Sequence, residues 1–147
     1  MKMTNTIKLT IVALTGTIGL ALTATAQDAS GTPPAAATLP PASAKPGVTY
    51  ASDIKAILDA SCAKCHGGDH PKARLKLDSL EGALKGSKDG PIIKTGDSAN
   101  SFIVKSVSHL TADHDSWMPP LHNRAGIKPL TPDQIGLIRA WIDQGAK

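Results

Sequence analysis

The chain has 147 residues, 41% of them hydrophobic but only 3% aromatic, a length that fits one domain after a leader is removed. Losing Lys2 and Lys8 with that leader leaves fourteen of the sixteen Lys and Arg against twelve Asp and Glu, which excludes a nucleic-acid-binding protein. The few aromatic side chains leave the core short of apolar area, so we expect another large apolar body to help fill it.

Residues 1–26 are predicted to be a secretory signal peptide. Lys2 and Lys8 form its positive start, residues 11–22 are apolar and uncharged, and Ala-Thr-Ala at 24–26 is a small-residue cleavage site with no Cys after it. The apolar run is shorter than the roughly 20 residues of a membrane-spanning helix. We therefore predict a periplasmic or otherwise exported protein that meets the membrane only through its transient signal peptide. An uncleaved anchor is the alternative.

The next segment, residues 27–47, is rich in Ala, Pro, Ser and Thr and is predicted to be an extended, poorly ordered linker. The folded domain is predicted to span residues 48–147. Thr49 or Ser52 can cap a first helix. The apolar residues of this helix recur at helical spacing, which predicts one buried face. They are Ile54, Ile57, Leu58 and Cys62.

Two further helices are predicted in the middle of the domain. After a short extended stretch at 75–77, residues 79–85 form a small helix closed by Gly86. Ser98 or Asn100 can begin the next helix. The residues that we expect on one side of that helix are Phe102, Ile103, Val107 and Leu110.

The last helix has the clearest boundaries. Residues 131–134, Thr-Pro-Asp-Gln, form a capping box with Pro at the first helical position, and Gly145 is a stop signal. The apolar face of this helix is made by Ile135, Ile138, Trp141 and Ile142. No internal repeat and no long strand pattern occurs in the sequence. The predicted class is therefore all-α, with three to five helices and long loops.

The chemistry of the chain is carried by residues 62–66, Cys-Ala-Lys-Cys-His. The two-residue gap places both thiols near one side of a turn, where they can add to the two vinyl groups of one haem, and the following imidazole can bind the iron. The motif ends an amphipathic helix in a chain with no other Cys. We therefore predict one covalent haem c, attached through Cys62 and Cys65, with His66 as the proximal iron ligand.

Two other readings of the cysteine pair remain open. The pair could be a structural or redox disulfide, although such CxxC motifs usually begin a helix after a strand. It could also be half of a zinc site, although no second Cys pair exists.

The second axial ligand is predicted to be Met118. Of the three Met residues it alone lies beyond residues 1–26, and it precedes two prolines, Pro119 and Pro120, that stiffen its loop. A thioether is a common partner of His on haem iron. Met is also an ordinary core filler, and the rival ligands are His109, His114 and His122, of which His114 is nearest in sequence.

The sequence resembles the planctomycete-type cytochrome c domain, a branch of the class I cytochrome c fold, from about Tyr50 to Lys147. The matching segments are residues 54–58, 62–67, 75–78, 96–98, 118–120, 130–131, 141–143 and 145–146. The resemblance implies haem c, His and Met ligation, electron transfer, and a first and last helix that cross beside one haem. The CxxCH motif also opens the domain, whereas in the four-helix cytochromes c′ it lies near the chain end.

These features predict a one-electron carrier and not an enzyme, because a six-coordinate iron has no free position for a substrate. The alternatives are a five-coordinate gas-binding or sensor haem protein and a haem-free CxxC thiol-redox module. The redox partner is expected to present an acidic surface to a positive rim. That rim consists of Lys64, Lys72, Arg74 and Lys76. The His66 ring is expected to donate its Nδ1 hydrogen to a nearby carbonyl, with Pro71 the predicted acceptor.

Overall fold

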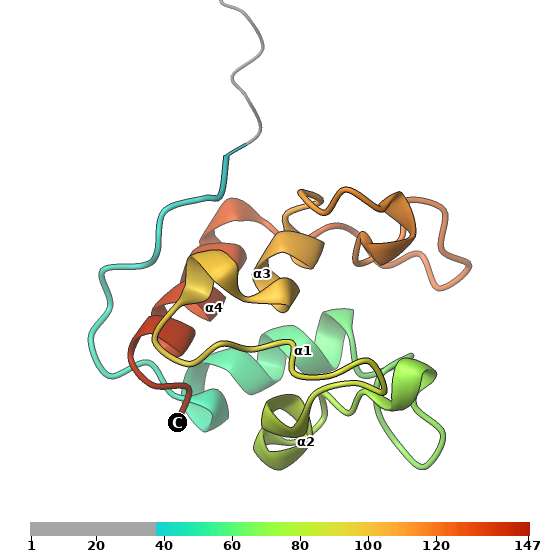
Figure 1. Cartoon of the computed structure of the whole chain (residues 1–147), viewed down its shortest axis with the longest axis horizontal. Coiled ribbons are helices and arrows are strands. Elements are labelled where there is room, and N and C mark those ends of the chain that lie inside the picture. The colour runs from blue at the N-terminus through green and yellow to red at the C-terminus, as the bar shows by residue number, and fades with distance from the viewer. Residues whose placement is uncertain (1–37) are drawn as a thin grey trace, which may run out of the picture. The chain divides into compact units, whose positions relative to one another are not determined.

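The computed structural model describes residues 38–147 (Figure 1), so the predicted signal peptide and the start of the predicted linker lie outside the described residues. The elements in chain order are η1 (Tyr50–Ile54), α1 (Lys55–Ser61), η2 (Lys72–Arg74), α2 (Leu80–Lys85), η3 (Ser98–Asn100), α3 (Phe102–Val107), η4 (His114–Ser116) and α4 (Pro132–Asp143). No strand occurs among residues 38–147, and one isolated bridge joins Ser87 to Gly90. The all-α prediction is confirmed. Within the same range, no helix is long and apolar enough to cross a membrane.

The first helix begins where its cap predicts. The Thr49 side chain accepts a hydrogen bond from the Ser52 N–H, and the π-helical turn η1 continues directly into α1. Ile54, Ile57 and Leu58 are all buried. This helix therefore presents its apolar face to the core and delivers Cys62 at its C-terminal end, where the Cys62 N–H still donates to the Leu58 carbonyl.

Of the two short middle helices, α2 follows its predicted boundaries. The other, α3, begins at Phe102, after the separate turn η3 at Ser98–Asn100, and ends at Val107, before the predicted Leu110. The Ser79 side chain caps α2, and Gly86 ends it with a φ of 85° that an L side chain rarely adopts. The predicted buried face of α3 is correct for Ile103 and Val107, but Phe102 is 47% exposed. Phe102 is the first residue of a six-residue helix, and its side chain lines a cavity instead of the core.

The last helix, α4, is the centre of the core. Its capping box between Thr131 and Gln134 is present as predicted. Trp141 is fully buried, its ring centroid lies 6.0 Å from that of Tyr50, and its indole Nε1–H donates to the Lys147 carbonyl at 2.9 Å. The first and last helices therefore meet through the N-terminal turn η1, at Tyr50.

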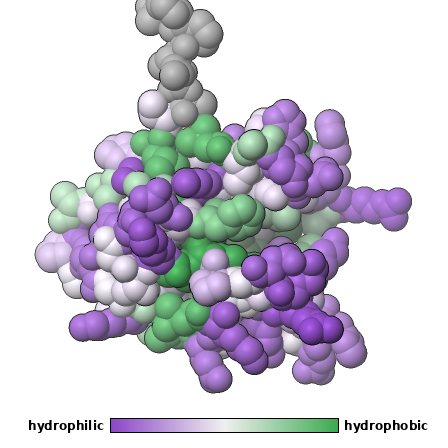
Figure 2. All heavy atoms as spheres, viewed as in Figure 1, coloured by the Kyte–Doolittle hydropathy of each residue, from purple (hydrophilic) through white to green (hydrophobic). Residues whose placement is uncertain are grey.

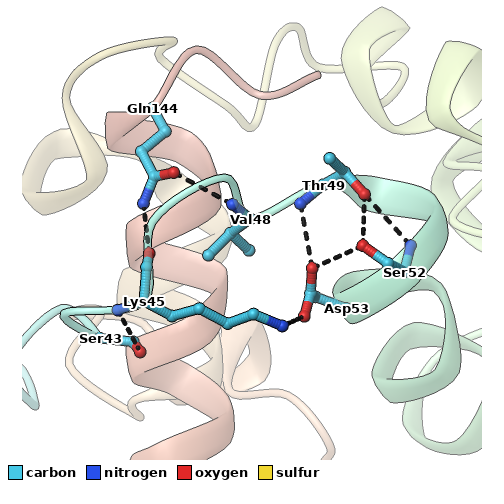
Figure 3. Close-up of polar contacts among 7 residues, drawn as sticks. All are labelled: Ser43, Lys45, Val48, Thr49, Ser52, Asp53 and Gln144. Atoms are coloured by element: carbon cyan, nitrogen blue, oxygen red, sulfur yellow. Dashed lines mark hydrogen bonds and ion pairs between the residues drawn. The ribbon is translucent and has the colours of Figure 1, made fainter.

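Residues 38–47, the described part of the predicted linker, run along α4 (Figure 3). The Ser43 N–H donates to the Gly136 carbonyl at 2.9 Å, and the Gln144 side-chain amide donates to the Lys45 carbonyl at 2.8 Å. The ammonium of Lys45 pairs with the carboxylate of Asp53 at the start of the first helix. The segments before and after the predicted boundary at residue 48 therefore both pack against α4.

Candidate functional site

A cavity of about 960 Å³ opens beside the C-terminal end of α1. Such a volume lies at the upper end of the range for cofactor sites. Figure 2 shows hydrophobic residues in a recess of one face, with hydrophilic side chains around it. The cavity wall is built from residues of the segments 61–66, 72–77, 87–92, 102–107 and 115–127. It contains Cys62, Cys65, His66 and Met118, so the structure brings together all four predicted site residues.

The CxxCH segment folds into a tight turn as α1 ends. The N–H groups of Cys65 and His66 both donate to the Cys62 carbonyl, at 3.0 and 2.8 Å. The backbone after the motif is closed by two further bonds, from the Lys72 N–H to the Cys65 carbonyl at 2.9 Å and from the Leu77 N–H to the His66 carbonyl at 2.7 Å. Both thiols and the imidazole are therefore presented from one fixed stretch of backbone.

The His66 ring is oriented by a main-chain acceptor. Its Nδ1 atom lies 3.1 Å from the Lys72 carbonyl oxygen. The prediction of a carbonyl acceptor in this loop is confirmed, but the predicted residue, Pro71, is wrong by one position because the loop turns into η2 at Lys72. Burial lowers the pKa of His66; the hydrogen bond to the Lys72 carbonyl opposes this shift, and the nearby Lys72 charge adds to it. The neutral ring with Nδ1 protonated leaves Nε2 free to bind a metal.

The two cysteines differ in exposure. Cys62 is buried, Cys65 is half-buried, and both are free thiols. Burial, with a smaller contribution from the neighbouring Cys65, raises the pKa of Cys62 to about 11. A thiol of this kind stays protonated at neutral pH, unlike the depressed-pKa thiol of a redox-active CxxC motif.

Met118 reaches the cavity from the loop after α3. It is half-buried and packs against the hydrophobic core, and Pro119 beside it is buried. The Met118 N–H donates to the carbonyl of Ser106 at 3.1 Å, and the Ser106 hydroxyl donates to the carbonyl of Ser116. The Met118 loop is therefore fastened to α3 at two points.

Of the three rival histidines, two pack against Trp117 and one lines the cavity. His109 stacks on Trp117 with ring centroids 5.0 Å apart, and His114 lies against the same indole at 4.0 Å. Neither lines the cavity, whereas His122 does, with an exposed side chain. The structure thus makes His122, and not His114, the rival nearest to the site.

Sequence reasoning missed several residues of the cavity wall. Ser106 and Phe102 come from α3, and Arg124 comes from the loop after it. Of the predicted rim, Lys64 and Lys72 line the cavity, while Arg74 and Lys76 do not. The CxxCH motif identifies directly the part of the cavity wall to which it belongs. The sequence could have predicted that α3 forms the opposite part of the wall only if Ser106 had been assigned to the same helix face as Ile103.

The last helix also differs from its expected role. No residue of α4 lines the cavity, so α4 supports the core behind the site and does not wall off an edge of it. The contact between the first and last helices at Tyr50 and Trp141 lies in the core. The wall expected from α4 is supplied by α3 and the loop at residues 115–127.

The cavity fits a covalently attached haem by the chemistry of its donors. It combines two free thiols spaced for thioether bonds, an oriented neutral imidazole and a thioether with apolar neighbours. Residues 62–122 match the family described as Planctomycete cytochrome C, whose members carry covalent haem c. No curated protein and no solved structure matches the chain. The matched region runs from the first cysteine of the motif to His122 and includes Met118, and this match supports a planctomycete-type cytochrome c domain.

Proposed function

We propose that this protein is an exported, single-haem c-type cytochrome that carries one electron between partner proteins. Cys62 and Cys65 would hold the haem, and His66 and Met118 would bind its iron. The observation that carries the proposal is the meeting of these four side chains, from two distant parts of the sequence, in one cavity of about 960 Å³. When bound, the haem supplies a ferric/ferrous one-electron couple.

The residues of the chain would set the properties of that couple. The Lys72 carbonyl fixes the His66 ring and raises its basicity as a ligand. The Met118 thioether is a soft ligand that favours ferrous iron, and the apolar wall from Leu75, Ile92 and Ile103 disfavours the more highly charged ferric site. Together these contributions predict a high reduction potential. With His66 and Met118 both bound, no iron position is left for a substrate, and we propose a carrier and not an enzyme.

The placement of the cysteines favours this function over a thiol-redox module. Reactive CxxC thiols usually lie at the start of a helix, where the helix dipole stabilises the thiolate. Here Cys62 lies at the C-terminal end of α1, and burial raises its pKa. The same position is well suited to presenting two thiols and an imidazole to a flat ligand.

Three finer features belong to the same proposal. The sequence holds two cysteines and one CxxCH, which supports one haem. The leader-like residues 1–26 support export to the periplasm or beyond. The order of helices, with CxxCH after the first and a long Met-bearing loop before the last, supports the class I cytochrome c fold.

We further propose that a partner with an acidic surface docks at the cavity mouth. Lys64, Lys72 and Arg124 contribute three cations there, against the carboxylates of Asp89 and Asp115. A positive rim of this kind raises the association rate with an acidic partner at low ionic strength.

Optical spectra of the holo-protein in both redox states test the function. The protein should be produced with its leader in a host that attaches haem c. We expect a pyridine haemochrome spectrum of one haem bound through two thioethers, a low-spin six-coordinate ferrous form, and the weak long-wavelength ferric band of a sulfur–iron bond. A five-coordinate ferrous spectrum would instead indicate a gas-binding or sensor protein, and a chain that takes up no haem would exclude both.

A further inference from the structure

Three polar side chains are buried in the described core, and one of them lies inside a helix. Ser98 and Ser101, each 1% exposed, lie around the start of α3, and Ser106, 4% exposed, lies within that helix. The Ser98 hydroxyl donates to Asp143 on α4, and the Ser101 hydroxyl donates to the Asp97 carbonyl at 3.0 Å. Both therefore fasten the N-terminal side of α3 to its surroundings.

Ser106 bonds in a different direction. A serine inside a helix usually turns its hydroxyl to the carbonyl one turn back or to water. The Ser106 hydroxyl instead leaves the helix and donates to the carbonyl of Ser116, ten residues later. Its own carbonyl accepts the N–H of Met118 at 3.1 Å. The two bonds bracket residues 116–118 and hold the backbone of Met118 against α3.

The face of α3 that holds this loop is also a wall of the cavity. Ile103, Ser106 and Val107 all line it, at the spacing of one helical face. Ser106 thus forms part of the cavity wall and also fixes the backbone from which the Met118 side chain extends. Ala has the higher helix propensity and carries no polar group to bury. A serine at this buried position is therefore explained by the loop that it binds and not by the helix that contains it.

We propose that Ser106 is a positioning residue that keeps Met118 within reach of the haem iron. This inference rests on the proposed function, in which Met118 is the second axial ligand. Ser106 itself contacts the Met118 loop through its hydroxyl and carbonyl, and it holds the loop whether or not the thioether is bound. Without the hydroxyl, the Ser116 carbonyl loses its partner and the Met118 loop is held to α3 by one of its two bonds.

The test compares two buried serines of the same region in holo-protein. Ser106→Ala removes the loop bond, and Ser101→Ala removes a buried hydroxyl of equal size that does not line the cavity. Both variants should lower the thermal midpoint. Only Ser106→Ala should weaken the long-wavelength ferric band and speed carbon monoxide binding to the ferrous protein, by about tenfold, the factor that one buried hydrogen bond can supply. Ser106→Thr, which keeps a hydroxyl, should stay closer to the parent in both measurements.

Two results would overturn the inference and are distinguishable. If Ser106→Ala binds carbon monoxide no faster than Ser101→Ala and keeps the ferric band, Ser106 serves stability alone and the proposed function stands. If the parent itself lacks the band and binds carbon monoxide freely, Met118 is not a ligand, and the ligand assignment falls together with the role of Ser106.

Discussion

The Nδ1 atom of His66 lies 3.1 Å from the main-chain carbonyl oxygen of Lys72, and the N–H of the same Lys72 donates to the Cys65 carbonyl at 2.9 Å. One peptide segment therefore closes the loop after the CxxCH motif and orients the imidazole. The Lys72 side chain lines the cavity mouth and takes no part in these two bonds. The backbone and the side chain of this residue should have separable effects.

We first predict that Lys72→Ala leaves the His66 ligation unchanged, whereas Lys72→Pro does not. Proline removes the N–H that donates to Cys65, which costs about 1–3 kcal/mol if that carbonyl finds no other partner. Lys72→Pro should therefore lower the thermal midpoint and shift the optical spectrum of the ferrous protein. Equal spectra and midpoints for the two variants would show that this loop does not orient His66.

The parts of the fold that were predicted correctly depend on local chemistry. Thr49, Ser79 and Thr131 each cap the helix that follows, because a cap needs only a side-chain oxygen and the next turn of backbone. The CxxCH turn is equally local, since its hydrogen bonds join neighbouring residues. Met118 could be placed at the site because it is the one Met outside the predicted signal peptide.

What the sequence did not show depends on contacts between distant segments. Ser106 became part of the site through a bond to Ser116, and Phe102, the first residue of α3, lines the cavity instead of the core. His122 lines the cavity, whereas His114 packs against the indole of Trp117 and does not. No periodicity or motif encodes these relations, because each one depends on how the long loop folds back.

Our second prediction concerns the positive rim. A Lys64→Gln, Lys72→Gln double variant should lower the rate of electron transfer with an acidic partner at low salt and flatten its decline with added salt. The matched control is Arg74→Gln with Lys76→Gln, since these two cations do not line the cavity. Stopped-flow rates over a range of ionic strengths measure both. A parent rate that is independent of salt, or equal slopes for the two double variants, would exclude docking through this rim.

A third prediction follows from the ion pair at the start of the first helix. Hydrogen bonds from Lys45, Ser52 and the Thr49 N–H lower the pKa of Asp53 from its ordinary 3.8 to about 2 (Figure 3). The Asp53 side chain is only 7% exposed. A carboxylate with a depressed folded-state pKa stabilises the fold above its unfolded pKa, and the contribution disappears as the pH falls through the folded value.

The parent should therefore melt at a higher temperature than Asp53→Asn at pH 5, and the difference should shrink between about pH 4 and pH 2. Asp59→Asn is the control, because Asp59 pairs with Lys55 on an exposed helix surface where such pairs contribute little. Thermal melts of the holo-proteins across this range provide the measurement. A difference that stays constant down to pH 2 would contradict the role of Asp53.

The fourth prediction tests the packing of residues 38–47 against α4. Gly136→Ala inside a helix would ordinarily stabilise it by about 1 kcal/mol. A Cβ atom at Gly136 would lie 2.8 Å from the Pro41 carbonyl oxygen, a contact with backbone that cannot rotate away. We expect Gly136→Ala to destabilise a chain that begins at residue 27 and to stabilise one that begins at residue 48, as followed by denaturant unfolding. The same sign in both chains would mean that residues 38–47 do not pack on α4 in solution.

The last prediction concerns Met118. Met118→Ala should keep the haem attached, because attachment needs only the CxxCH motif, but it should open the sixth iron position. The reduction potential should decrease, because the preference of the thioether for ferrous iron is lost. The size of the decrease should stay within the roughly 0.8 V that axial ligands control. Carbon monoxide should bind the reduced variant readily and the parent poorly. Met118→His should stay six-coordinate and also have a lower potential.

The structure also predicts which side chain replaces the lost thioether. His122 lines the cavity, whereas His114 packs against Trp117. If a histidine binds in Met118→Ala, adding His122→Ala should convert the spectrum to that of a water-bound or five-coordinate iron, and adding His114→Ala should change nothing. The reverse pattern would mean that His114 leaves Trp117 and binds the iron when Met118 is removed. An unchanged potential and spectrum in Met118→Ala itself would show that the parent iron is held by another residue, and the expected high potential would no longer have a structural basis.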